Sequence, residues 1–226
     1  MQREGIIVFD MDGVLVDVTH SYRAAIMATV EHFTGRAVSN DVIQDYKNTG
    51  GWNNDWALSQ KIIQDFGRDI DYPTVVAYFQ SVFIGNGNGA GLISQERWIV
   101  SNDLLLDLRE RFALAIFTGR LRSEAFVTLH RFLPDFEFDM VVADDDVRNP
   151  KPAPDGLHLI AKKLPKLPIL YIGDTVDDAQ AARDAGVRFI GIAHRANPRH
   201  EDLACRLREL GATHVFDNVN ELPSVL

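Results

Sequence analysis

Short apolar runs alternate with longer stretches of helical period along this chain of 226 residues. The short runs are continuously apolar, without intervening polar residues, which is typical of parallel strands buried on both faces. Helical stretches between such strands predict an α/β fold, in which helices cover a doubly wound parallel sheet. The predicted strands are residues 6–9, 114–117, 140–143, 169–172, 189–192 and 214–216.

An insertion is predicted between the first two strands, because about a hundred residues separate them and one crossover helix needs far fewer. We expect a helical domain over residues 18–94, and a core domain over residues 1–17 and 95–226. Glycines mark turns at residues 49–51 and 85–91, and the second stretch fits neither a dinucleotide-binding motif nor a P-loop. Helical spacing within the insertion covers residues 19–35, 41–46, 56–66 and 74–83.

Composition narrows the class of protein. The net charge is −9 and no Lys or Arg stripe is evident, so a nucleic acid is a poor candidate partner. Cys205 is the one cysteine, which excludes an internal disulfide or a cysteine-based zinc site and suits a reducing compartment. The apolar run at residues 6–9 is too short for a signal peptide, and no uncharged stretch approaches a membrane span. We expect a soluble, cytoplasmic protein.

Two acids, Asp10 and Asp12, follow the first predicted strand, and Gly13 then lets the backbone turn sharply. Ligands gather at the carboxyl ends of the strands in an open α/β sheet, so the location suits an active site. An acidic strand end followed by glycine is common, however. The pair alone leaves a site and a structural turn both open.

Polar groups follow the second strand and precede a later helix. Thr118, Gly119 and Arg120 offer a hydroxyl and backbone amides that could hold a phosphate oxygen, although a threonine that caps the next helix is the alternative. Lys151 stands among three prolines. A lone lysine is usually solvated surface, but the prolines stiffen this backbone and reduce the entropy lost on fixing the ammonium group.

Three more acids, Asp174, Asp177 and Asp178, follow the fourth strand at the start of a helix. Helix capping and the helix dipole favour acids at a helix N-terminus, and they explain one or two acids there better than they explain three. The acids, Thr118 and Lys151 occur in chain order at successive strand ends. This combination favours a catalytic site over separate structural roles.

The chain resembles the haloacid dehalogenase superfamily, in particular its phosphatase-type members related to phosphoglycolate phosphatase and β-phosphoglucomutase. Four segments carry the resemblance: FDMDGVLVD, TGR, NPKPAPDG and GDTVDDAQAARDAG. The first and last are highly specific, and the other two add weight through their order. The resemblance spans the whole chain and implies a Rossmann-like core with strand order 3-2-1-4-5, together with a helical cap inserted after the first strand.

The resemblance also implies catalytic roles. Asp10 matches the nucleophile that forms an aspartyl-phosphate, and Asp12 matches the general acid and base. Thr118 resembles the donor to a phosphate oxygen, and Lys151 resembles the cation that holds nucleophile and phosphate together. Relatives that cleave carbon–halogen or carbon–phosphorus bonds typically lack the second acid, so Asp12 favours phosphate ester chemistry.

A Mg²⁺ site is implied in the same way. The matching metal ligands are Asp10, the backbone carbonyl of Asp12, and Asp174, with Asp178 as a frequent supporting or alternative acid. Asp177 lies outside the family pattern, which leaves the division of metal binding among the last three acids open. The physical reasoning agrees, because a carboxylate that approaches an anionic phosphate is repelled unless a cation lies between them, and Mg²⁺ prefers oxygen ligands.

Substrate-binding residues are expected in the core and in the cap. Thr118, Gly119, Arg120 and Lys151 are the core candidates. In the cap, the glycine pair, the polar side chains of residues 47–54 and the family's specificity loop indicate Lys47 and Asn54.

The sequence therefore predicts a magnesium-dependent phosphate monoester hydrolase. Its partner would be a small phosphorylated metabolite, with no nucleic acid or membrane, and the protein a monomer or homodimer. A phosphomutase is the alternative, and a phospho-acceptor signalling domain or an inactive binding module is a more distant one. A phosphonate hydrolase would need a cap lysine such as Lys47 or Lys61, but Asp12 argues against it. Trp52, Trp56 and Trp98 could line a pocket or belong to the hydrophobic core.

Overall fold

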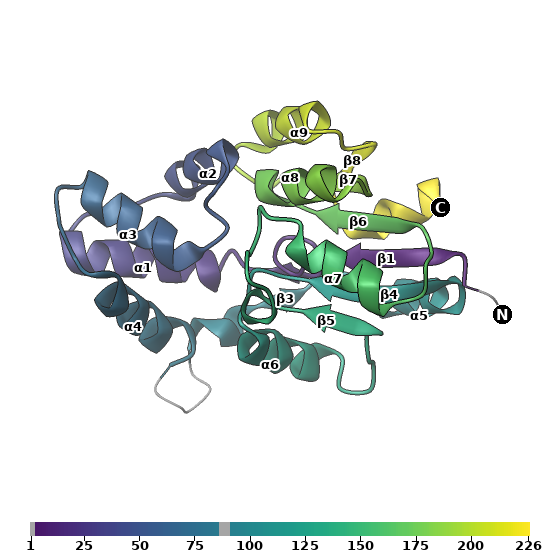
Figure 1. Cartoon of the computed structure of the whole chain (residues 1–226). Coiled ribbons are helices and arrows are strands. Elements are labelled where there is room, and N and C mark those ends of the chain that lie inside the picture. Colours follow the sequence, from purple (N-terminus) through teal and green to yellow (C-terminus); the bar gives the residue numbers. More distant parts are fainter. Residues whose placement is uncertain (1–2, 86–90) are drawn as a thin grey trace.

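A six-stranded parallel sheet forms the centre of the computed structural model, which describes residues 3–85 and 91–226 (Figure 1). The order β5-β4-β1-β6-β7-β8 corresponds to 3-2-1-4-5-6 when the strands of this sheet are counted along the chain. The predicted fold class and strand order are confirmed, with the sixth predicted strand at the edge. The strands are β1 (Gly5–Phe9), β4 (Phe112–Phe117), β5 (Met140–Val142), β6 (Ile169–Gly173), β7 (Arg188–Ile192) and β8 (His214–Phe216).

Helices cover both faces of the sheet, which explains why its central strands are continuously apolar. Side chains of β1 point alternately into the two layers, Ile7 and Phe9 into one and Ile6 and Val8 into the other. The first layer contains α5 (Asn102–Arg111), α6 (Arg122–Phe132) and the 3₁₀ segment η3 (Val219–Val225). The second contains α7 (Asp155–Lys163), α8 (Val176–Ala185) and α9 (His200–Glu209).

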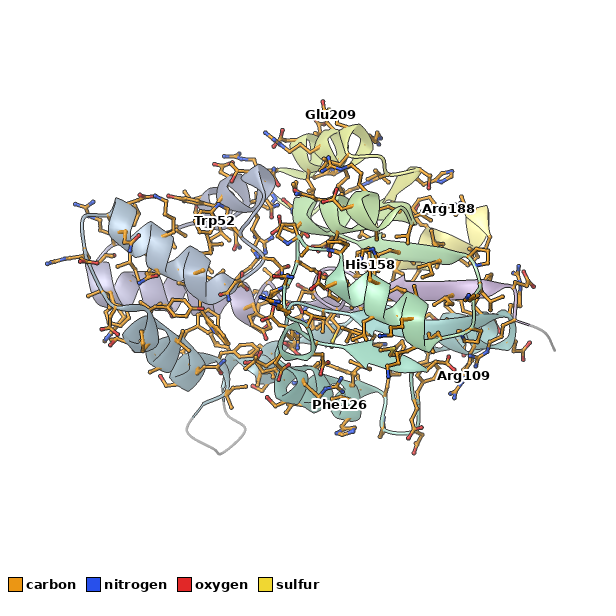
Figure 2. All side chains as sticks on the ribbon, viewed as in Figure 1. Trp52, Arg109, Phe126, His158, Arg188 and Glu209 are labelled. Carbon is orange, nitrogen blue, oxygen red and sulfur yellow. The ribbon has the colours of Figure 1, made fainter. Side chains whose placement is uncertain are left out.

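Of the helices between β1 and β4, the first four form a separate group, on the left in Figure 1, whereas α5 packs on the sheet. Their apolar faces meet in a hydrophobic cluster of their own, which includes Ile26, Ile62 and Phe79. The labelled Trp52 in Figure 2 packs against the same group. The predicted helical segments are confirmed, whereas the domain boundaries at residues 18 and 94 stay a prediction. The helices are α1 (Tyr22–Thr34), α2 (Asn40–Thr49), α3 (Asp55–Asp65) and α4 (Tyr72–Phe83).

A small antiparallel sheet joins the two parts and was not predicted, because each strand has only two residues. In it β2 (Val16–Asp17) pairs with β3 (Arg97–Trp98). The 3₁₀ segment η1 (Leu92–Gln95) precedes β3, and a second, η2 (Asp144–Asp146), follows β5. The outgoing and returning chains therefore lie side by side. Trp98 stacks on Phe132 with ring centroids 5.6 Å apart, so it belongs to the core packing.

Two sequence expectations concern segments at the margins of this fold. Residues 86–90 of the glycine-rich return loop lie outside the described residues. In the part of the chain that is described, no helix has both the length and the apolar character required to cross a bilayer.

Candidate functional site

Strand register brings the predicted site residues to one edge of the sheet. Phe9, the last residue of β1, is aligned with Ile116 of β4 on one side and Ile172 of β6 on the other. The backbone N–H of Asp10 continues this ladder and donates to the Ile172 carbonyl at 2.8 Å. Because the three strands end together, the polar residues that follow them converge.

Lys151 joins two of these acids in the protein interior. Its ammonium group lies 2.8 Å from Asp10 Oδ1 and 2.7 Å from Asp178 Oδ1, and the side chains of all three are almost fully buried. Burial alone would lower the pKa of Lys151, but the charges of Asp10 and Asp178 outweigh it and raise that pKa. Lys151 is therefore a fixed positive charge beneath Asp10, as the surrounding prolines suggested.

The carboxylate of Asp178 has partners at both oxygens. Oδ1 accepts from the Tyr171 hydroxyl and faces Lys151, while Oδ2 accepts from the Thr175 hydroxyl at 2.6 Å and the Thr175 backbone N–H at 3.1 Å. Thr175 in turn caps α8 by accepting from the backbone N–H of Asp178. Asp178 thus anchors both Lys151 and the start of α8.

Asp174 differs from Asp178, because its Oδ1 is buried and has no hydrogen-bond partner among the described residues. Carboxylate oxygens of Asp10, Asp174 and Asp178 lie within 4.8 Å of one another. Burial raises the pKa of Asp10 to about 7 and that of Asp174 well above its ordinary value, and the repulsion among the acids adds to both shifts. A buried carboxylate oxygen that has no donor among the described residues, beside a second acid, fits the oxygen ligand set of Mg²⁺.

Gly13 permits the close approach of the first and fourth motifs. Its φ is 71°, a left-handed conformation that favours glycine. A Cβ atom at this position would lie 2.0 Å from Asp174 Oδ2. The glycine after the acid pair is therefore required for space as well as for its backbone conformation.

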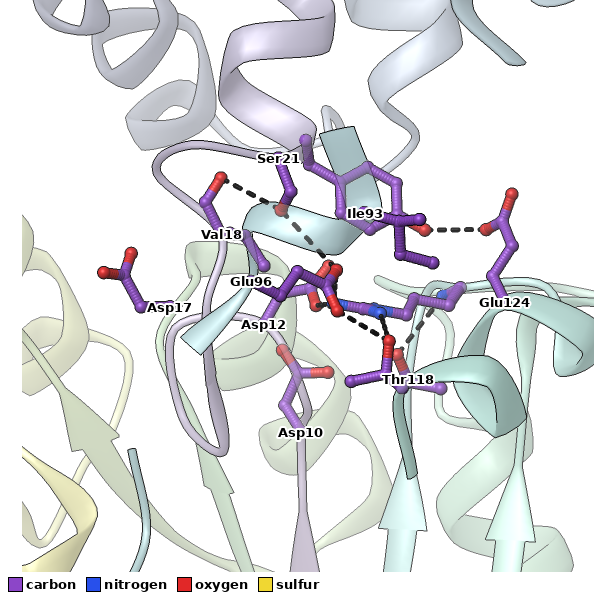
Figure 3. A network of polar contacts seen from close by, with 12 residues as sticks. Asp10, Asp12, Asp17, Val18, Ser21, Ile93, Glu96, Thr118 and Glu124 are labelled. Atoms are coloured by element: carbon purple, nitrogen blue, oxygen red, sulfur yellow. Dashed lines mark hydrogen bonds and ion pairs between the residues drawn. The ribbon is translucent and has the colours of Figure 1, made fainter. Parts of the chain in front are cut away.

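Asp12, which is itself partly exposed to the cavity, joins a second network of otherwise buried residues, shown in Figure 3. Arg120 Nε donates to Asp12 Oδ1 at 2.7 Å, and its Nη2 donates to Glu96 Oε1 at 2.8 Å. Thr128 accepts from Arg120 Nη1 at 2.7 Å and donates to Glu96 Oε2 at 2.6 Å. The guanidinium also lies over the ring of Tyr22, 4.9 Å from its centroid. Arg120 is thereby held in place on several sides.

The other residues of the second motif lie close to Arg120. Thr118 is buried, and its hydroxyl accepts from the backbone N–H of Arg120 at 3.2 Å. Gly119 faces the helical group, since a Cβ there would lie 2.1 Å from Asn53 Nδ2. The predicted phosphate contacts of these residues stay predictions. The structure adds that the Arg120 side chain already has three protein partners.

A cavity of about 270 Å³ separates the sheet edge from the helical group. Asp10, Asp12 and Asp174 line its core side, together with Gly119 and Arg120. Helices α1 to α3 and the loop after β7 supply the opposite wall, which is rich in polar side chains, among them Arg23, Gln44, Lys47, Asn53, Asn54 and Asn197. The core side of the cavity therefore carries acids and Arg120, and the opposite wall carries amides and cations.

Comparison with known proteins decides the family. A family model for haloacid dehalogenase-like hydrolases matches residues 5–186. The chain belongs to this family. The resemblance inferred from the four motifs is thereby confirmed.

Two proteins similar in sequence to this haloacid dehalogenase-like hydrolase have different names. An imidazoleglycerol-phosphate dehydratase from Phytophthora nicotianae is 35% identical over 196 residues, which are 82% of this chain and 42% of that protein. This chain therefore corresponds to less than half of the dehydratase. A phosphoglycolate phosphatase from Colwellia psychrerythraea is 25% identical over 226 residues and covers 98% of this chain and 96% of its own.

A solved structure supports the same fold. The crystal structure of a predicted phosphoglycolate phosphatase from Haemophilus somnus superimposes with a TM-score of 0.76 and 18% identity. The match covers 100% of this chain and 99% of that one.

In this family member, both predicted cap residues line the cavity but already have protein partners. Lys47 Nζ pairs with Asp55 Oδ1 at 2.7 Å. Asn54 caps α3, because its Oδ1 accepts from the backbone N–H groups of Trp56 at 3.0 Å and Ala57 at 2.9 Å. Their predicted part in substrate binding stays a prediction.

Asp177 connects the core to the cap loop. Its Oδ1 accepts from the backbone N–H of Gly51 at 2.6 Å. A Cβ at the neighbouring Gly50 would lie 3.4 Å from the same oxygen. The acid outside the family pattern therefore faces the loop that carries the predicted specificity residues.

Sequence reasoning missed a set of buried polar residues that join the two parts of the molecule. Glu124, on α6, accepts from the Tyr22 hydroxyl and from Gln80 Nε2, each at 2.6 Å. Glu96 pairs with Arg120. No local motif identifies Glu96 or Glu124, because their partners lie on distant segments. Polar residues such as Gln95, Arg97 and Ser123 flank them, so their sequence neighbourhood resembles that of ordinary surface acids.

Proposed function

We propose that this chain is a magnesium-dependent phosphatase that hydrolyses a small phosphate monoester through a phosphorylated Asp10. The observation that carries the proposal is a buried oxygen of Asp174 that has no partner among the described residues and lies beside Asp10. Lys151 pairs with Asp10 in the same place. Asp10 and Asp174 would hold Mg²⁺ with the backbone carbonyl of Asp12, and Asp178 would support them through Lys151. When bound, the ion neutralises negative charge on the phosphate and on these acids.

In the first half of the reaction, an oxygen of Asp10 attacks phosphorus and the bond to the leaving alcohol breaks. Lys151 stabilises Asp10 and the phosphoryl oxygens by its fixed charge, and Thr118 and the backbone of Gly119 contribute hydrogen bonds. Asp12 gives its proton to the departing oxygen. The products of this half are the free alcohol and an aspartyl-phosphate.

In the second half, water attacks phosphorus and the bond to Asp10 breaks. Asp12, now ionised, takes a proton from the water, so that inorganic phosphate leaves and both acids return to their starting states. Arg120 keeps Asp12 oriented at the core side of the cavity in both halves of the reaction. One residue therefore serves as acid and then as base.

We further propose that residues 18–94 form a cap that covers the site and selects the leaving group. The wall supplied by α1 to α3 and the contact of Asn53 with Gly119 support this role. The cavity volume of about 270 Å³ suits a small metabolite. The phosphatase names of relatives across the full chain length agree with it.

The proposal is tested by hydrolysis of p-nitrophenyl phosphate with Mg²⁺ or with EDTA. The wild type should release p-nitrophenol and phosphate only with the metal, and Asp10→Asn should abolish turnover while circular dichroism stays unchanged. Near-normal turnover by Asp10→Asn would contradict the nucleophile assignment. A signalling domain should show almost no turnover, and a phosphomutase should transfer phosphate to a second sugar phosphate faster than to water.

A further inference from the structure

Arg23, on α1, carries a positive charge on the cap side of the cavity. Its Nη2 donates to Gln44 Oε1, whereas Nη1 is buried and has no hydrogen-bond partner among the described residues. Burial lowers the pKa of Arg23, and the charges of Asp174, Asp55 and Asp17 oppose this shift. Arginine nevertheless stays charged in proteins. A buried guanidinium N–H that faces no acceptor is costly, which points to an acceptor supplied from outside the chain.

Among the described residues, none of Asp174, Asp55 and Asp17, the acids whose charges act on Arg23, lies within ion-pair distance of its guanidinium. Within the described residues, Arg23 takes part in no ion pair. Asp55 is paired with Lys47, and Asp12 with Arg120. Glu124 accepts from Tyr22 and Gln80. In the described part of the chain, Arg23 is thus a cavity arginine that has no paired carboxylate, unlike Arg120.

Gln44 holds the guanidinium in a fixed position. Its Oε1 accepts from Arg23 and also from Asn197 Nδ2 at 3.0 Å, while its Nε2 donates to Asn48 Oδ1 at 2.8 Å. Asn48 continues to Asp202 on α9 at 2.7 Å. The chain of amides runs from the cap to the core, so Arg23 is oriented before any ligand binds, which lowers the entropy cost of recognition.

A second unpartnered atom lies on the same wall. Asn40 lines the cavity, and its Oδ1 is buried without a hydrogen-bond partner in the described part of the chain. Two unmet polar atoms, a donor at Arg23 and an acceptor at Asn40, therefore border the space opposite Asp10. The cap wall suits a leaving group that is polar and carries an acceptor with full negative charge.

We infer that Arg23 binds an anionic group on the leaving alcohol, a carboxylate or a second phosphate. The inference rests on the proposed phosphatase function and narrows it to substrates with two anionic ends, one at Asp10 and one at Arg23. A charged acceptor is favoured over a neutral one because a charge-assisted hydrogen bond is roughly twice as strong. A cationic leaving group would be repelled by the guanidinium, which has no ion-pair partner among the described residues.

Binding gives a test that does not depend on turnover. Asp10→Asn with Mg²⁺ is titrated calorimetrically with alkyl monophosphates of two to four carbons that end in carboxylate, phosphate, hydroxyl or ammonium. At the best chain length, the carboxylate or phosphate form should bind about 10- to 100-fold more tightly than the hydroxyl form. Whichever of the carboxylate and phosphate forms binds more tightly shows which anionic group Arg23 recognises. Equal affinities, or tightest binding of the ammonium form, would overturn the inference.

The role of Arg23 itself is tested by Arg23→Gln and Arg23→Lys in the same background. Glutamine should remove the preference for an anionic end, and lysine should restore part of it. Arg68→Gln is the matched control, because Arg68 is an exposed arginine on the same helical group and should leave the preference intact. Thermal melting shows whether Arg23→Gln folds. If it does not fold, Arg23→Lys alone tests the role of Arg23, and we expect it to show a smaller preference for an anionic end than the parent.

The two proposals fail in different ways. If the wild type hydrolyses p-nitrophenyl phosphate with Mg²⁺ but its kcat/KM does not favour anionic ends, only the role of Arg23 is wrong. If no monophosphate binds or turns over, the phosphatase function is wrong and the inference about Arg23 falls with it.

Discussion

Arg120 holds one oxygen of Asp12 with two nitrogens, Nε at 2.7 Å and Nη2 at 2.6 Å. The two residues are 108 positions apart in the chain. Only 1% of the Arg120 side chain is exposed, and Glu96 and Thr128 bind its remaining N–H groups. The geometry makes Arg120 a positioning residue for the proposed acid and base.

Arg120→Lys should lower kcat by about 100-fold with little change in KM, because an ammonium group cannot contact Asp12, Glu96 and Thr128 together and a small misplacement of a catalytic group is costly. Steady-state kinetics on an alkyl phosphate measure the effect. Arg122→Lys is the control, since Arg122 forms a partly exposed pair with Asp146. Equal losses in the two variants would argue against a specific role for Arg120.

Mg²⁺ should stabilise the folded protein through Asp174. The unpartnered oxygen of Asp174 and the crowding of three acids destabilise the metal-free site. At a free Mg²⁺ concentration 100 times the dissociation constant, the gain in unfolding free energy should be about 2.7 kcal/mol. Thermal melting with and without Mg²⁺ measures it. Asp174→Asn should lose the response, and the exposed Asp184→Asn, on the helix α8 that follows Asp174, should keep it.

Gly13→Ala should cost far more activity than Gly186→Ala. Both glycines have positive φ, 71° and 67°, so each substitution should cost about 1 kcal/mol of stability from the backbone alone. A Cβ at Gly186 meets no atom within 4 Å, whereas one at Gly13 would displace Asp174. We expect turnover to fall by roughly 100-fold in Gly13→Ala only. Similar activity in both variants would contradict the close approach to Asp174.

Asp144 should make stability depend on pH. Partial burial and the charge of Asp145 raise the pKa of Asp144 to about 6. Its pKa in an unfolded chain is about 3.9. Between these values the folded protein binds the proton more tightly, so its stability falls as pH rises from about 4 to about 6.

Asp144→Asn should remove this loss. The quantity to compare is the unfolding free energy of the variant minus that of the wild type. This difference should be about 1 kcal/mol larger at pH 7 than at pH 4, a value reduced because the carboxyl is partly exposed. Urea unfolding at several pH values measures the difference. The exposed Asp135→Asn should run parallel to wild type, and a parallel curve for Asp144→Asn would show that burial has little effect on that carboxyl.

Much of the fold followed from local sequence. All six strands of the main sheet lie where the sequence predicted them. In the central strands β1, β4 and β6, burial on both faces imposes continuous apolar runs, whereas the edge strand β8 begins with the exposed His214. The two-residue strands β2 and β3 escaped prediction because so short a segment has no measurable period. Trp98 could be assigned to a pocket or to the core from its sequence, and only its stacking on Phe132 decided between them.

The candidate site was partly visible in the same way. Asp10 and Asp174 were identifiable because parallel strands end at a common edge, so that acids after two such strands must meet. The partners of Asp177 and Arg120 could not be identified from the sequence. Gly51 and Glu96 lie on segments whose approach depends on how the helical group packs against the sheet.

The sequence by itself determined the strands, the inserted helices, the family and the order of the four motifs. These properties are encoded by residues near one another in the chain. Tertiary structure alone decided that Arg120 faces Asp12. It also decided that, among the described residues, both oxygens of Asp178 have partners, whereas one oxygen of Asp174 and one N–H nitrogen of Arg23 have none. Hydrogen bonding of a buried group depends on atoms brought from distant segments, and their positions are fixed only when the cores of the helical group and the sheet have packed.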